Sequence, residues 1–180
     1  MKKAMLIVLV TMFVASYAYA GPYDYIGLFF DTGHTVCQTT VVGDVFFYYY
    51  VWAKPATLGL QAVEFKIVLP PIVYDTGAMT LNVGINLTLG AIATGWSATF
   101  ANCQPGGTWI QVYRQRVFCD TGLAPDGVIE IVETDDSHNL GLSTCLMMDE
   151  RFTVLNHAHI NLTCLIGTKD ASWGAIKSLF

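Results

Sequence analysis

The sequence has little positive charge and carries none of the short motifs that identify common enzyme classes. Nine Lys and Arg residues stand against fourteen Asp and Glu residues, which gives a formal net charge of −5. A surface of this charge repels phosphate backbones, so we expect no nucleic-acid partner. Gly-x-Ser-x-Gly, a phosphate-binding glycine loop and Cys-x-x-Cys are all absent. The sequence therefore predicts neither a catalytic activity nor a cofactor.

Long hydrophobic runs are also missing, apart from one at the start of the chain. A pair of lysines precedes the apolar segment Ala4–Val14, and Ala18-Tyr19-Ala20 matches an Ala-x-Ala cleavage site. The segment is shorter than the ~20 residues of a membrane span. We predict a signal peptide at residues 1–20 and no transmembrane segment after its cleavage. The mature chain would lose two lysines and carry a net charge of −7. The predicted location is a bacterial periplasm, cell surface or culture medium.

Five cysteines are present, and in an exported chain they predict two disulfides and one free thiol. If successive strands alternate in direction, Cys37 and Cys103 fall at the same end of the fold. Cys119 then lies at the opposite end, about ten residues away at ~3.3 Å per residue. This geometry favours the pairs Cys37–Cys103 and Cys145–Cys164 and leaves Cys119 free. The alternative is that the free thiol forms a disulfide with another molecule.

Two strand-like runs, Val45–Ala53 and Leu60–Leu69, are joined by the turn Lys54-Pro55-Ala56-Thr57. In the second run apolar and polar residues alternate, which is the pattern of a half-buried strand. The first run is apolar or aromatic on both faces, so we expect it to be covered at both edges. This pair of strands is the predicted centre of the fold.

Two further runs predict long strands. Met79–Leu89 alternates most regularly and predicts one half-buried strand with Leu87 and Leu89 on its apolar side. Thr108–Cys119 also alternates, but its phase changes along the run. A bulge near Arg114–Arg116 would explain the change and would direct arginine towards solvent.

The whole pattern predicts an all-β protein. Seven or more strands with no helical period between them favour two antiparallel sheets packed as a β-sandwich. We assign this domain to residues 21–165 and a short C-terminal tail to residues 166–180. Glu133–Ser137 predicts an exposed acidic loop within the domain.

The triplet Asp-Thr-Gly occurs at Asp31, Asp75 and Asp120. Aspartic proteases bring two such carboxylates together to share a proton. The residues around Asp75 come nearest to the retroviral-type protease motif, although Tyr74 and Met79 depart from it. Asp-x-Gly is also the sequence of an ordinary turn. We therefore expect turns at these positions.

His157 and His159 are two residues apart and would lie on one face of a strand. Together they could supply half of a metal site, with His138, Asp149 or Glu150 as a third ligand. Two ligands at this spacing also arise easily by chance. The expected role is structural, without a bound metal.

Aromatic side chains are the remaining candidates in the sequence for binding a ligand. Trp96, Trp109 and Tyr113 could form a flat platform for sugar rings if they lie together on the surface. Core packing and cross-strand pairing are the commoner roles of such residues in a sandwich.

Gly43-Asp44-Val45-Phe46-Phe47, followed by the run Gly59–Ile67, resembles the opening strands of cohesin-type secreted β-sandwiches. The likeness covers about Gly43–Phe100. It implies a two-sheet β-sandwich of cohesin-like or immunoglobulin-like type. Cohesins bind a partner module and catalyse no reaction, so the resemblance also implies a binding or scaffolding role.

These observations favour an exported, non-enzymatic β-sandwich that binds a protein partner or assembles with itself at a cell surface. The first alternative is a carbohydrate-binding module that uses the three aromatic residues. The second alternative is a hydrolase whose catalytic groups are distant in the sequence.

Overall fold

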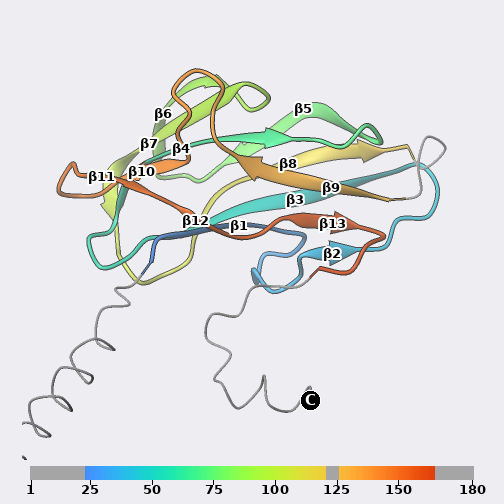
Figure 1. Cartoon of the computed structure of the whole chain (residues 1–180), viewed down its shortest axis with the longest axis horizontal. Coiled ribbons are helices and arrows are strands. Elements are labelled where there is room, and N and C mark those ends of the chain that lie inside the picture. The colour runs from blue at the N-terminus through green and yellow to red at the C-terminus, as the bar shows by residue number, and fades with distance from the viewer. Residues whose placement is uncertain (1–22, 121–125, 165–180) are drawn as a thin grey trace, which may run out of the picture.

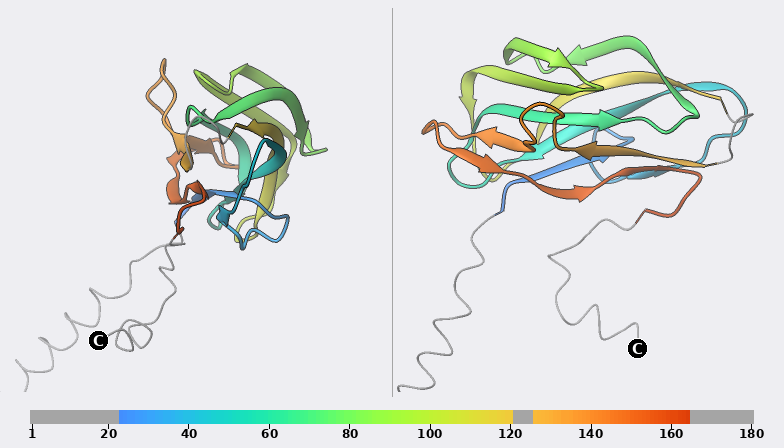
Figure 2. Two further views of the ribbon diagram at one scale, coloured as in Figure 1. Left: turned by 90° about the vertical axis from the view of Figure 1, so that its right-hand side faces the viewer. Right: turned by 45° about the horizontal axis from the view of Figure 1, so that its top comes forward.

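The part of the chain that the structure describes is built from strands alone. The computed structural model describes residues 23–120 and 126–164, so the predicted signal peptide and C-terminal tail lie outside it. Its thirteen strands form two sheets, and most of them run along the long axis of the molecule (Figures 1 and 2). Among these residues there is no helix that could cross a membrane.

The first sheet has the strand order β12-β1-β3-β8-β5. Its strands are Tyr25–Phe29 (β1), Val45–Lys54 (β3), Val73–Leu81 (β5), Ile110–Cys119 (β8) and Thr153–Asn156 (β12). The aromatic strand β3 pairs with β1 along one edge and with β8 along the other. The sequence prediction that this run is covered at both edges is confirmed.

The second sheet is organised around β4, which pairs with β7 along one edge and with β10 and then β9 along the other. Strand β6 extends the sheet beyond β7, and β11, β13 and β2 extend it on the other side. The strands are Gln38–Thr39 (β2), Leu60–Val68 (β4), Ile85–Ala91 (β6), Gly95–Gln104 (β7), Gly127–Val132 (β9), Gly141–Ser143 (β10), Asp149–Arg151 (β11) and Ala158–Ile160 (β13).

Strands near the two ends of the described chain pair in parallel. β1 runs parallel to β12, and β2 runs parallel to β13. The other pairs in the described residues are antiparallel. The predicted two-sheet β-sandwich is confirmed, although these two parallel pairs make both sheets mixed.

The core between the sheets is rich in aromatic rings. Phe65 from β4 is fully buried, with its ring centre 5.4 Å from that of Trp96 and 6.0 Å from that of Tyr113. The hydroxyls of Tyr113 and Tyr49 lie 3.4 Å apart. Burial raises the pKa of both phenols, so both stay protonated at neutral pH. The inward residues of β4 thus pack on the facing sheet, as its alternation predicts.

Two details of the predicted strands were wrong. Met79–Leu89 is not one strand, because the chain passes from β5 to β6, and so from one sheet to the other, through the turn at 82–84. The phase change in β8 is present, but the extra residue is Val112, which lies next to buried Tyr113. Arg114, beyond the bulge, is exposed and stacks on the Tyr48 ring at 5.3 Å.

The two disulfides are Cys37–Cys164 and Cys103–Cys145, and Cys119 is buried and free. The prediction that Cys119 remains free is confirmed. The predicted pairs Cys37–Cys103 and Cys145–Cys164 were wrong. They counted Met79–Leu89 as one strand, whereas the chain forms β5 and β6 there, so the predicted number of reversals between Cys37 and Cys103 was one too few.

The parallel pair explains the first disulfide. Gln38 pairs with His159, so the strand that follows Cys37 lies beside β13. The chain then turns at Asn161, whose φ is 57°. The turn brings Cys164 back to Gln38, whose side chain accepts a hydrogen bond from the Cys164 backbone N–H at 3.0 Å.

The second disulfide crosses the start of β4. Cys103 lies on β7 and Cys145 follows β10, and these strands flank β4 on opposite edges. A Cβ atom at Gly59 would lie 2.7 Å from Cys145 Sγ and 2.4 Å from the backbone oxygen of Gln104. Gly59 also has a φ of 74°, so the crossing requires glycine here.

Candidate functional site

Asp31 stabilises a turn and takes no part in a catalytic pair. Its carboxylate accepts hydrogen bonds from the backbone N–H groups of Gly33, Thr35 and Val36 at 2.9–3.2 Å, and from Thr35 Oγ1 at 2.8 Å. These bonds lower the pKa of Asp31 against the opposing effect of burial. The turn expected from Asp-Thr-Gly is present at this position.

The other two triplets do not place a carboxylate beside Asp31 or beside each other. Asp75 lies on β5, three strand positions from β1, and accepts hydrogen bonds from Gly77 N–H at 2.7 Å and from Gln115 Nε2 at 2.5 Å. Asp75 pairs with Val117. Asp120 lies three residues further along, which is a distance of about 10 Å along a strand. Two carboxylates share a proton only when they are in contact.

His157 and His159 lie on one side of their segment, since Ala158 between them is fully buried. His157 Nδ1 accepts a hydrogen bond from the backbone N–H of Ile131 at 3.3 Å. No group of three His, Cys, Asp or Glu residues that could hold a metal ion occurs in the described residues. The observed contact of His157 is structural.

The predicted aromatic platform does not form. Trp96 is 4% exposed and Tyr113 is 0% exposed, so both belong to the core and the prediction was wrong for them. Trp109 is partly exposed and packs against His34, with ring centres 4.9 Å apart. Alternation could not separate these roles, because it does not show which face of a strand is covered.

Small and polar side chains form much of the outer side of the second sheet. On β7 the residues Ser97 and Thr99 alternate with the buried Trp96, Ala98 and Phe100 and therefore point outward. The residues of the two neighbouring strands that pair with Ser97 and Thr99 point outward as well. We call this surface the outer face, and its residues are Ala62, Glu64, Leu87, Leu89, Ser97, Thr99 and Ser143.

Two leucines at one edge give the outer face its apolar character. Leu87 pairs with Thr99, and Leu89 pairs with Ser97. Their side chains are 53% and 61% exposed. The sequence prediction placed both on a buried side, but β6 is the last strand of its sheet, and among residues 23–120 and 126–164 no second layer of strands covers the outer face. These two leucines are the exposed large apolar side chains of the outer face.

Glu64 holds the segment after β9 against the outer face. Glu64 Oε1 accepts hydrogen bonds from Ser137 Oγ at 2.5 Å and from Thr134 Oγ1 at 3.3 Å. Glu64 Oε2 accepts a hydrogen bond from Asn139 Nδ2 at 3.2 Å. The acidic loop Glu133–Ser137 is therefore fixed in place by a carboxylate of the sheet.

The acidic loop also reaches the turn between β6 and β7. The backbone N–H of Asp135 donates to the backbone oxygen of Thr94 at 2.9 Å, and Lys66 Nζ forms an ion pair with the Asp135 carboxylate at 2.7 Å. A Cβ atom at Gly95 would lie 3.0 Å from Thr134 Cβ. The loop thus closes one end of the outer face, and the leucines border one side.

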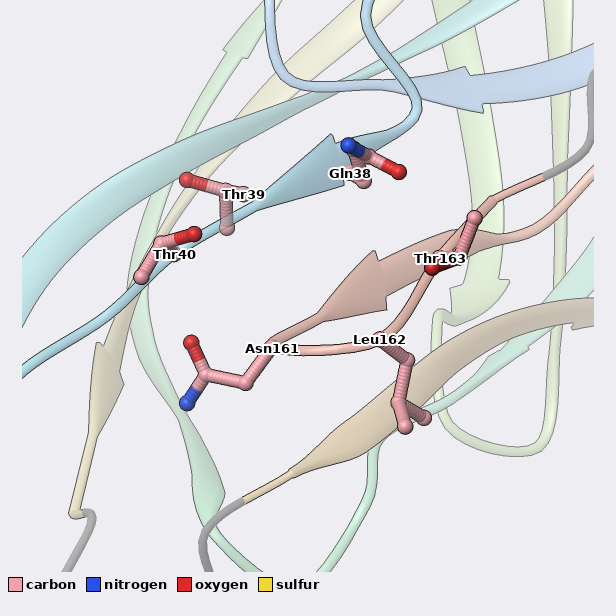
Figure 3. A pocket seen from close by; sticks show the side chains of 6 residues that line it. All are labelled: Gln38, Thr39, Thr40, Asn161, Leu162 and Thr163. Atoms are coloured by element: carbon pink, nitrogen blue, oxygen red, sulfur yellow. The ribbon is translucent and has the colours of Figure 1, made fainter.

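A polar groove lies between β2 and the turn that follows β13 (Figure 3). Its lining residues are Gln38, Thr39, Thr40, Asn161, Leu162 and Thr163. Asn161 Oδ1 accepts a hydrogen bond from Val41 N–H at 2.7 Å, and Asn161 Nδ2 donates to the Val41 backbone oxygen at 3.1 Å. The amide is used by the fold, so the outer face is the better candidate site.

Burial lowers the pKa of two imidazoles, and this predicts a loss of stability in acid. Burial is the largest cause at both His34 and His157, and it outweighs the attraction of Asp31 and Glu130 respectively. The unfolded chain then binds more protons than the folded chain once the pH falls below about 6.5. Above that pH the two histidines make their full contribution to the free energy of unfolding. This contribution is lost as the pH falls through the pKa that each histidine has in the folded protein.

His157→Asn tests this prediction, because an asparagine oxygen can accept the Ile131 N–H without titrating. We expect the Tm of this variant to fall less between pH 7.5 and pH 5.5 than the Tm of the unchanged protein. The pKa of Glu150 is raised by its hydrogen bond with Asp24, which acts in the opposite direction. The variant and the unchanged protein both contain Glu150, so its effect cancels when their changes of Tm are compared. Equal changes of Tm would contradict the assignment to His157.

Comparison with known proteins identifies the fold. No family model and no curated protein matches this sequence. A type II cohesin domain from the cellulosome of Acetivibrio cellulolyticus matches with a TM-score of 0.56 and 13% identity, over 78% of this chain and 96% of that chain. A chain of a type I cohesin–dockerin complex from Clostridium thermocellum matches with a TM-score of 0.51 and 6% identity, over 77% of this chain and 98% of that chain. The protein has a cohesin-like fold.

Proposed function

We propose that this protein is an exported, non-enzymatic interaction module that binds a partner protein through the outer face. The observation that carries the proposal is the exposed pair Leu87 and Leu89, which lies beside Ser97 and Thr99 on the outer face. Apolar side chains within a polar surface are the usual anchors of a protein interface. Small residues such as Ala62 and Ser97 let the main chain of a partner approach the sheet closely.

The rigidity of the outer face supports the same function. Glu64 and Lys66 are engaged with the acidic loop, so these groups are already ordered before a partner arrives. A surface that is ordered in advance loses less conformational entropy on binding. The outer face also spans several strands, which suits the area of a protein partner.

The fold comparison supports binding of a protein partner as well. One of the similar chains comes from a cohesin–dockerin complex, in which a cohesin is bound to a dockerin. We extend to this chain only the class of function, which is recognition of another protein module. The N-terminal sequence and the two disulfides support export to an oxidising compartment.

A photo-cross-linking amino acid at Thr99 tests the proposal, because Thr99 is central on the outer face. The labelled protein is mixed with the exported proteins of its own cell. We expect a discrete covalent product with one protein. The same label at Thr40, which is exposed in the polar groove, is the control and should give no such product.

Leu89→Glu tests the contribution of the leucines to the affinity for the captured partner. We expect the Kd to rise at least tenfold, which is about 1.4 kcal/mol, because the substitution removes an apolar anchor and adds a charge. Val42→Glu adds the same charge at a side chain that is 89% exposed before β3, and it should leave the Kd unchanged. Equal effects of the two substitutions, measured by calorimetry, would place the interface elsewhere.

A further inference from the structure

The outward side of the first sheet carries a row of aromatic rings on β3. Tyr49 is buried, so the residues that alternate with it on this strand point outward. Among them, Phe46 and Tyr48 are exposed and Tyr50 is partly exposed. Strand β8 pairs with β3 (Figure 1) and adds two arginines to the same side. We call this surface the arginine face, and its residues are Phe46, Tyr48, Tyr50, Arg114 and Arg116.

Each of the two arginines lies over a ring of β3. The Cζ atom of Arg116 is 4.2 Å from the centre of the Phe46 ring, and that of Arg114 is 5.3 Å from the centre of the Tyr48 ring. These contacts position the guanidinium groups and leave N–H donors available to an acceptor. Within the described residues, neither guanidinium forms an ion pair or donates a hydrogen bond. Two guanidinium groups placed in this way are suited to a negatively charged ligand.

Positive charge without an ion-pair partner in the described residues gathers on the first sheet. The described chain contains five Lys and Arg residues. Two of them, Lys66 and Arg151, lie on the second sheet and form ion pairs. The other three are Lys54, Arg114 and Arg116, which lie on β3 and β8. A protein with a net charge of −5 therefore presents a local positive surface on this sheet.

Negative charge is nearly absent from the strands of the same sheet. β1, β3, β8 and β12 contain no Asp or Glu. β5 contains one, Asp75, which accepts a hydrogen bond from Gln115. Because Gln115 is buried between the sheets, this carboxylate is directed to the inner side. The arginine face is thus complementary in charge to an acidic partner.

The spacing of the two arginines indicates the conformation of that partner. Arg114 and Arg116 are two residues apart on one strand, so their side chains leave the same side of the sheet about 6.6–6.8 Å apart. Alternate side chains of an extended peptide have the same spacing and also lie on one side. In a helix, residues two apart do not face the same way. An extended peptide can therefore present one carboxylate to each guanidinium.

We propose that the arginine face binds an extended acidic segment of a partner protein, with Asp or Glu at two alternate positions. Each carboxylate accepts hydrogen bonds from one guanidinium group. The rings of Tyr48 and Tyr50 flank these contacts, and Tyr and Arg are residues that protein interfaces favour. This surface belongs to the first sheet, so the proposal goes beyond partner binding at the outer face of the second sheet.

A separate protein is a better source of the segment than a second copy of this chain. In the described residues, Glu133 and Asp135 are the one pair of acidic residues at alternate positions. Both are already in ion pairs, Glu133 with Arg151 and Asp135 with Lys66. The acidic loop that contains Asp135 is also held against the second sheet. These carboxylates would have to leave their partners before they could reach another molecule.

An NMR titration with a synthetic peptide tests the proposal. The probe is Gly-Thr-Glu-Thr-Glu-Thr-Gly, at a salt concentration of about 0.1 M, where charges more than about 10 Å away are largely screened. The control peptide, Gly-Thr-Thr-Glu-Glu-Thr-Gly, has the same composition but directs its carboxylates to opposite sides of an extended chain. We expect the probe to shift amide signals of β3 and β8 and to bind at least fivefold more tightly than the control peptide.

Substitution of the arginines tests the assignment of the contacts. Arg114→Gln and Arg116→Gln should each raise the Kd of the probe about tenfold, because each removes one of two charged contacts. Arg151→Gln removes the same charge from an exposed side chain of the second sheet and should leave the Kd unchanged. Leu89→Glu should also leave it unchanged, which separates this site from the outer face. Thermal unfolding of each variant verifies that it is folded.

Four results would overturn the proposal. Equal affinities for the two peptides would show a general attraction of charge, and an unchanged Kd in both arginine variants would place the peptide elsewhere. Binding of polygalacturonate without binding of the probe would identify a surface for acidic sugars. Self-association that Arg116→Gln abolishes, again without binding of the probe, would identify a second copy as the occupant.

Discussion

Replacement of Cys37 and Cys164 together by serine should lower the free energy of unfolding by about 5 kcal/mol. The disulfide joins residues separated by 127 positions, so it restricts the unfolded chain strongly. It also ties the start of the two-residue strand β2 to the chain that follows β13. Urea denaturation of the oxidised protein and of the variant measures the difference, with the linear slope used to verify two-state behaviour.

The matched control is replacement of Cys103 and Cys145 by serine. These two cysteines are 42 positions apart, which predicts a smaller loss of about 4 kcal/mol in the free energy of unfolding. Domains of this size are commonly stable by about 5–15 kcal/mol, so the first variant should lie near the limit of folding at room temperature. A loss below about 1 kcal/mol on removal of Cys37–Cys164 would contradict the account based on restriction of the unfolded chain.

Phe65→Ala should lower the free energy of unfolding by about 4 kcal/mol. The ring is 0% exposed and packs against both Trp96 and Tyr113, which also contact each other. Its removal would leave a cavity that these two large rings cannot fill without leaving their own positions. The loss therefore includes both the hydrophobic transfer of the ring and the cost of the cavity.

Phe46→Ala is the control for this substitution. Phe46 lies on β3 and is 52% exposed, with contacts to Arg116 and Phe118. Its loss should cost about 1 kcal/mol, because most of the side chain is already in water. Urea denaturation of the two variants should therefore give midpoints that differ clearly. Similar midpoints would show that Phe65 is less important to the core than its burial implies.

Local sequence patterns were sufficient to predict the strands of the core. In β4 the alternation that ends at Val68 shows which residues face inward, and the structure buries Val63, Phe65 and Ile67. The free Cys119 also followed from local geometry, because it lies at the far end of its strand. These predictions succeed because strand period depends on neighbouring residues only.

Features that depend on distant parts of the chain were missed. The Cys37–Cys164 disulfide follows from the parallel pairing of β2 with β13, which are more than a hundred residues apart, and no local pattern indicates this pairing. The exposure of Leu87 and Leu89 depends on β6 being the last strand of its sheet and on an outer face that no other strand of the described chain covers. Alternation predicts that a strand has two faces, but the arrangement of the sheets decides which face is covered.

One sequence signal could have located the candidate site. The absence of charged residues from residue 76 to residue 113 is visible in the sequence, and it covers most of β5 and all of β6 and β7. In β6 and β7, this uncharged stretch coincides with part of the proposed interaction surface. Its position at an edge became clear only when β6 was placed beside β7 and no further strand.

The Cys37–Cys164 disulfide also determines how the molecule responds to a mechanical load. A pulling force applied at residues 23 and 164 passes through Cys37 and across the sulfur bridge, so the chain between residues 38 and 163 carries no tension. Only residues 23–36 can be drawn out, and they span at most about 50 Å at full extension. Even this requires β1 to shear away from β3 and β12. The oxidised molecule therefore behaves as a nearly inextensible link, and reduction converts it into one that can unravel under load.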